Sequence, residues 1–134
     1  MKLCKTTQEA IKNVSSINQS IIFKTGESRL NTISAEKNIL ASIAIDETFP
    51  VDCAIYDLNS FLGAINLFDD PELTFNDTNV IISEGNNNCV FYYTDPSIVI
   101  SPPEKDIKLP SLDVEFNLKE ESIYTLLKAS SVLG

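Results

Sequence analysis

The sequence of 134 residues contains no histidine and only four glycines. The commonest general base of enzymes is therefore missing, and no glycine-rich loop is present to bind phosphate. Cys4, Cys53 and Cys89 form no CxxC pair, and no apolar run approaches the ~20 residues of a membrane span. We expect a cytoplasmic, non-enzymatic protein with free thiols, no metal site, no cofactor and no contact with membranes.

Basic residues are also scarce, because ten lysines and arginines face nineteen acids and leave a net charge of −9. A surface that holds nucleic acid by overall electrostatic attraction is thereby excluded. The chain could still contact nucleic acid in two ways: through a local basic stripe, or through a contact that does not depend on tight binding. An acidic protein that mimics DNA is a further alternative.

The first segment, residues 6–20, has the apolar spacing of a helix that lies on a core. Thr6 or Thr7 is expected to cap its start. The predicted apolar stripe consists of Ala10, Val14, Ile17 and Ile21. A second stripe is polar, with Glu9 to its side, and contains Lys5, Gln8, Lys12, Ser15 and Gln19. Such a stripe is typical of a solvated helix face, but in so acidic a chain it could also contact a phosphate backbone.

Two further groups of segments follow the first helix. Three short β-branched runs (21–25, 28–34 and 37–45) predict a meander of hairpins. Then a strand at 51–56 leads to Asp57 as an N-cap, and three more strand-like runs follow the helix. The predicted apolar face of this second helix consists of Leu58, Phe61, Leu62 and Ile65. Together these segments indicate an internal repeat of about fifty residues, in the order strand, helix and three strands.

The composition changes at residues 95–110, where four prolines predict an extended connector. After it the pattern begins a third time, with a strand at 113–116 and a capping box formed by Asn117 and Glu120. The helix that follows is marked by Ile123, Leu126, Leu127 and Ser130. The third unit has no further strands, so the sequence looks truncated.

Three stretches together resemble the sliding clamps of T-even-type bacteriophages: MKLCKTTQEAIKN, VDCAIYDLNSFLGAINLF and NLKEESIYTLLKASSVL. These clamps are DNA polymerase processivity factors that share the fold of the proliferating cell nuclear antigen. The resemblance implies an α+β DNA-clamp fold of repeated strand–helix–three-strand units, with helices on one face of antiparallel sheets. It implies a first clamp domain at 1–94 (units 1–49 and 50–94), a connector at 95–110, and the start of a truncated second domain at 111–134.

The resemblance also implies a function and a site. The chain would be a subunit of a ring that encircles duplex DNA independently of sequence and tethers a replicative DNA polymerase. Its partners would be that polymerase, a clamp loader and, at full length, two further copies in a homotrimer, in the cytoplasm of an infected bacterial host. The basic positions that match DNA-facing positions of the family are Lys5, Lys12, Lys119 and Lys128.

Two alternatives belong to other functional classes. An acidic DNA mimic should carry carboxylates in a regular stripe, whereas here the acids are scattered over loops and caps, which argues against it. The second alternative is a clamp-derived interaction module that has lost ring closure. One domain and a fragment would not supply both faces of the usual ring interface, which favours this second alternative if the chain is complete.

Overall fold

The computed structural model describes residues 1–103 and 119–133. The chain divides into two units, Met1–Pro103 and Glu104–Gly134, and each is described here by itself. The elements of the first unit are α1 (Lys5–Ile17), β1 (Ile21–Phe23), β2 (Arg29–Ile33), β3 (Leu40–Ala44), β4 (Cys53–Ile55), α2 (Leu58–Ile65), β5 (Glu72–Phe75), β6 (Asn79–Glu84), β7 (Asn87–Tyr92) and a 3-10 turn, η1 (Pro96–Ile98). The second unit contains α3 (Glu120–Leu133). This is a mixed α+β architecture with antiparallel sheets.

Helix α2 forms as its sequence predicts. Asp57 caps its start, and the side chain accepts hydrogen bonds from the backbone amides of Asn59 and Ser60. The hydroxyl of Ser60 donates a further hydrogen bond to this carboxylate, which holds the pKa of Asp57 below its usual range. All four residues of the predicted apolar face are buried: Leu58, Phe61, Leu62 and Ile65.

Helix α1 begins two or three residues earlier than a threonine cap would allow, so the predicted cap at Thr6 or Thr7 is wrong. Cys4 is the N-cap, and its Sγ accepts a hydrogen bond from the amide of Thr7 at 3.4 Å. Thr7 is buried, and its hydroxyl donates instead to Glu47, from the connection between β3 and β4. The buried face also shifts by part of a turn, because Ile11 is fully buried whereas Ile17 is only half-buried.

The predicted meander of the first three strands is only partly correct. The strands β2 and β3 form the expected hairpin, but β1 pairs antiparallel with β4, in the register Ile21↔Ile55 to Phe23↔Cys53. After β1 the chain does not fold back, because Gly26, at φ +74°, donates its amide to the carbonyl of Phe49. The later meander β5–β6–β7 is confirmed.

Segments before and after the two helices exchange partners. The strand β4 precedes α2 and pairs with β1, which follows α1. In the other direction, Met1 precedes α1 and its carbonyl accepts the amide of Leu73, in β5 after α2, at 2.7 Å. The segment before each helix therefore pairs with a segment that follows the other helix.

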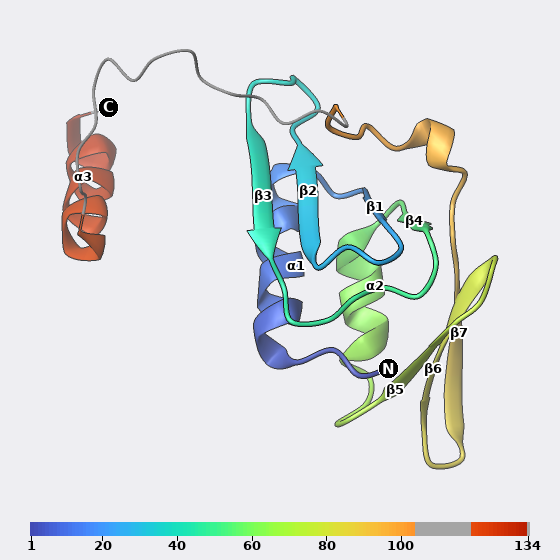
Figure 1. The fold of residues 1–134 in the computed structure, drawn as a ribbon. Coiled ribbons are helices and arrows are strands. Elements are labelled where there is room, and N and C mark those ends of the chain that lie inside the picture. The colour runs from blue at the N-terminus through green and yellow to red at the C-terminus, as the bar shows by residue number, and fades with distance from the viewer. Residues whose placement is uncertain (104–118, 134) are drawn as a thin grey trace. The chain divides into compact units, whose positions relative to one another are not determined.

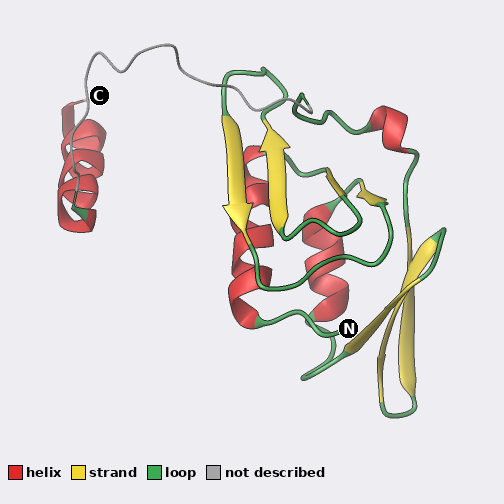
Figure 2. Ribbon diagram, viewed as in Figure 1, coloured by secondary structure: helices red, strands yellow, loops and turns green. Residues whose placement is uncertain are grey.

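The core lies between the two helices and the sheets. Figure 1 shows α1 and α2 side by side, with the β2–β3 hairpin in front of α1 and the β5–β7 sheet beside α2. Aromatic rings fill the centre: Phe23 stacks on Phe49 with ring centroids 4.3 Å apart, and Phe61 meets Phe91 edge-on at 5.4 Å. Figure 2 shows the same layers by element type. This packing fixes the position of α1 against α2.

The segment after β7 and the second unit complete the described chain. Asp95 caps η1, a single 3-10 turn where the sequence predicted a wholly extended connector. The predicted last helix is confirmed as α3, whose apolar residues are exposed within the described part of its unit. The predicted strand at 113–116 and the cap at Asn117 lie outside the described residues. In the part of the chain that is described, no helix has the length and apolarity to span a membrane.

Candidate nucleic-acid interface

The exposed side of the α1–α2 pair carries a shallow depression of about 280 Å³. We call it the α1–α2 groove; it is lined by Lys5, Gln8, Glu9 and Lys12 from α1 and by Leu62 and Asn66 from the end of α2. Both lysines are exposed, and within the described residues neither forms an ion pair. The structure therefore brings Lys5 and Lys12 together in one groove.

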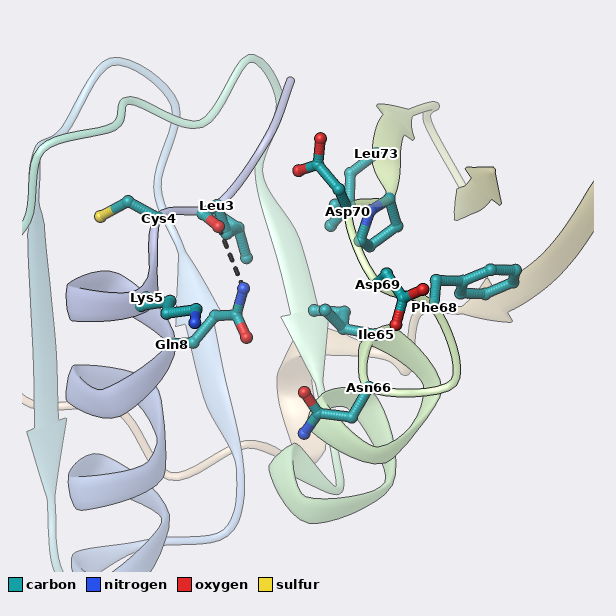
Figure 3. A pocket seen from close by; sticks show the side chains of 11 residues that line it. Leu3, Cys4, Lys5, Gln8, Ile65, Asn66, Phe68, Asp69, Asp70 and Leu73 are labelled. Atoms are coloured by element: carbon teal, nitrogen blue, oxygen red, sulfur yellow. Dashed lines mark hydrogen bonds between the residues drawn. The ribbon is translucent and has the colours of Figure 1, made fainter. Parts of the chain in front are cut away.

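A second, more enclosed cavity of about 260 Å³ adjoins the groove at the start of α1. Figure 3 shows Lys5 and Gln8 on α1 opposite Asn66 and Asp69 at the end of α2. Gln8 is fixed there, because its side-chain amide donates to the carbonyl of Leu3 at 3.0 Å. Lys5, Gln8 and Asn66 line both hollows, so the cavity and the α1–α2 groove are immediate neighbours.

The charge of the α1–α2 groove is mixed. The sequence placed Glu9 to the side of the polar stripe, whereas in the structure Glu9 lines the groove together with both lysines. Asp69 and Asp70 line the adjoining cavity near Lys5, and Asp70 is already paired with Lys2. The positive potential is therefore weak and local, unlike that of a surface built to bind phosphates tightly.

A carboxylate from another part of the chain holds the end of α1 that presents Lys5. Glu47 accepts hydrogen bonds from the Cys4 amide and the Thr7 hydroxyl. Partial burial acts to raise the pKa of Glu47, but these hydrogen bonds together outweigh it and leave the pKa below its usual range. A negative charge at a helix N-terminus also interacts favourably with the helix dipole. The interaction fixes where the first turn of α1 begins.

Comparison with known proteins identifies the family of this chain. The family model described as DNA polymerase processivity factor matches residues 2–99. The chain belongs to the DNA polymerase processivity factor family. It is 38% identical to the sliding clamp of Vibrio phage KVP40 over 138 residues, which cover 100% of this chain and 62% of that protein. It is 34% identical to the sliding clamp of Enterobacteria phage T4 over 97% of this chain and 57% of that protein.

The chain thus spans about three fifths of the length of these sliding clamps. Processivity factors of this family are not enzymes. Within residues 1–103 and 119–133, no cluster of histidine, cysteine, aspartate and glutamate side chains could hold a metal ion.

The other two predicted DNA-facing residues lie in the second unit. Lys119 immediately precedes α3, where its carbonyl accepts the amides of Ser122 and Ile123, and Lys128 lies within the helix. Nine residues of helix correspond to about 180° of rotation, so the two lysines emerge on opposite sides of α3. They do not form one stripe on this helix, in contrast to Lys5 and Lys12.

The predicted site included no residue from the α2 side of the groove. The sequence gives the second helix a polar face of Asn59, Ser60 and Asn66, and predicts that this helix packs and does not contact DNA. In the structure Asn66, directly after α2, lines the groove together with the two lysines. The available signal was the polar character of Asn66 at the end of this helix.

Proposed function

We propose that this chain is a sliding-clamp subunit whose α1–α2 groove faces the phosphate backbone of duplex DNA. The observation that carries the proposal is the groove itself, in which Lys5, Lys12, Gln8 and Asn66 offer donors from two helices. Lysines contact phosphates as point charges, and neither they nor the amides need to reach the base edges. Such contacts are independent of sequence, as a protein that moves along DNA requires.

Weak contacts suffice if a closed ring holds the subunit on DNA by topology. With a net charge of −9, the outside of the ring would repel other phosphates. A few lysines inside it would centre the duplex, and the contacts would exchange readily because each releases few counterions. The mixed charge of the α1–α2 groove agrees with a surface that guides DNA and does not hold it.

The proposed domain organisation has a first clamp domain at residues 1–94, made of units 1–49 and 50–94. A connector follows at 95–110, and a second domain begins at 111–134. The reciprocal pairing of Met1 with Leu73 and of β4 with β1 supports two related strand–helix units in the first domain. The lysines of the second unit, Lys119 and Lys128, would contribute contacts with DNA from the second domain.

The proposed partners follow from ring function. Three subunits would close around DNA, a clamp loader would open the ring, and a replicative polymerase would dock through apolar peptide anchors near the connector. All of this would take place in the cytoplasm of an infected bacterial host. Because the chain spans about three fifths of its relatives, ring closure is tested separately from contact with DNA.

The test of DNA contact compares two double variants of equal charge. Lys5→Gln with Lys12→Gln removes both groove lysines, whereas Lys24→Gln with Lys37→Gln removes two exposed lysines elsewhere. Binding to a labelled duplex is measured over a range of salt concentrations. The groove variant should lower the slope of log K against log salt by about 0.9 for each lost phosphate contact, and the control should change it little. Equal effects of the two variants would refute the groove as the DNA-facing surface.

The test of ring function combines light scattering after size-exclusion chromatography with a processivity assay on primed circular DNA. Trimers that extend synthesis in the presence of polymerase and clamp loader are the expected result. A monomer that is inactive in the assay would show that this polypeptide is a clamp-derived interaction module and not a working clamp.

A further inference from the structure

The structure places one carboxylate between the two groove lysines. Glu9 follows Lys5 by four residues and precedes Lys12 by three, so the three side chains leave α1 within an arc of about 60°. All three are exposed and line the α1–α2 groove. Glu9 forms no ion pair with either lysine in the described structure, so its charge faces the same space as theirs.

A carboxylate in this position has two effects on a passing phosphate. It repels the phosphate directly, and it lowers the positive potential that Lys5 and Lys12 produce in the groove. Residues three and four apart on a helix have Cβ atoms about 5–6 Å apart, which is less than the Debye length of about 8 Å at physiological salt, so screening does not remove the effect of Glu9 on the lysines. Asp69, on the α2 side of the adjoining cavity, acts in the same direction on Lys5.

We propose that Glu9 keeps the affinity of the α1–α2 groove for the DNA backbone low, so that the groove guides a duplex without retaining it. This inference rests on the proposed function, since it presupposes that the groove faces DNA. It assigns an opposing role to a residue on the same face as the lysines. The affinity is thus set by a balance of charges in the groove, and a count of lysines alone overestimates it.

The test uses the full chain and a fluorescein-labelled duplex of about 30 base pairs at about 50 mM salt, conditions in which weak backbone contacts are measurable. Glu9→Gln should tighten binding roughly two- to five-fold, because it removes one nearby negative charge at nearly constant shape. Glu27→Gln is the matched control, since it makes the same change of net charge in the exposed turn after β1. The control should alter binding much less.

A second substitution reverses the charge at position 9 and so tests whether the effect on DNA binding grows with the change of charge. Glu9→Lys should tighten binding further and add about 0.9 to the salt slope, because it provides one additional phosphate contact. Equal tightening by Glu9→Gln and Glu27→Gln would overturn the proposal, since net charge alone would then explain the effect. No tightening by either Glu9 variant would also overturn it.

The failure of this inference is distinguishable from failure of the proposed function. If removal of Lys5 and Lys12 weakens binding but the Glu9 variants behave like wild type, the groove faces DNA and only the role of Glu9 is wrong. If removal of the two lysines leaves binding unchanged, the proposed DNA-facing groove is wrong, and the role of Glu9 is wrong with it.

Discussion

Glu47 joins two distant parts of the chain, and its removal should destabilise the first unit measurably. One carboxylate oxygen accepts the amide of Cys4, and the other accepts the hydroxyl of the buried Thr7. Replacement by alanine removes both acceptors and leaves two donors facing a partly buried space. Hydrogen bonds to a charged group contribute about 1.5–3 kcal/mol, so we expect Glu47→Ala to lower the free energy of unfolding by about 2–3 kcal/mol.

Glutamine at the same position isolates the contribution of the charge. Its side-chain carbonyl can accept a hydrogen bond from the Cys4 amide. Its side-chain amide can donate a hydrogen bond to the oxygen of the Thr7 hydroxyl, which rotates to act as acceptor. Only the charge is lost, together with its interaction with the dipole of α1, which amounts to about 0.3–1 kcal/mol. Glu27→Gln in an exposed turn serves as the control and should have almost no effect on stability.

The pH dependence provides an independent check on the same carboxylate. The pKa of Glu47 is lower in the folded state than its ordinary value of 4.5, so its stabilisation is fully present above that value. The stabilisation is lost as the pH falls through the lower folded pKa. The stability difference between wild type and Glu47→Gln should therefore stay constant from neutral pH down to the ordinary value and shrink below it.

The assay is guanidinium denaturation followed by circular dichroism at several pH values. The reasoning predicts the order Glu47→Ala, then Glu47→Gln, then Glu27→Gln, from the most to the least destabilised. It is refuted if alanine at position 47 costs no more than the control substitution, or if the difference between wild type and glutamine persists unchanged in acid. The first result would mean that the contacts of Glu47 contribute nothing to folding, and the second would mean that its contribution does not come from its charge.

Three further predictions concern the core, the second helix and the thiols. Phe61→Ala should destabilise the first unit by about 3–5 kcal/mol in the same denaturation assay, because it removes a fully buried ring. Asp57→Ala should cost about 1 kcal/mol through loss of the α2 cap, and asparagine, which can also cap, should recover most of it. Burial raises the pKa of Cys53 to about 12, so Ellman's reagent should titrate Cys4 and Cys89 in the native protein and Cys53 only after unfolding. Rapid reaction of all three thiols in the native state would contradict the last prediction.

The elements that the sequence predicts well are those whose determinants lie close together in the chain. Asp57 and the apolar spacing after it suffice to define α2, because cap and buried face fall within three turns of one helix. The β5–β7 meander was predicted for a similar reason, since short turns connect strands that are neighbours in sequence. The placement of Lys5 and Lys12 on one face also followed from their spacing of seven residues.

The features that only the tertiary structure decided all depend on distant partners. Strand β1 pairs with β4 because the chain after β1 is joined to Phe49, and no local pattern encodes that contact. The start of α1 at Cys4 depends on Glu47, more than forty residues away in the sequence. Periodicity places Glu9 near the lysines on α1 but cannot say which side of the helix α2 will leave open. The packing of α2 against α1 determines which side of α1 remains exposed, and this side includes Glu9. The groove is formed by two helices, whereas the spacing of residues along the sequence describes only one of them.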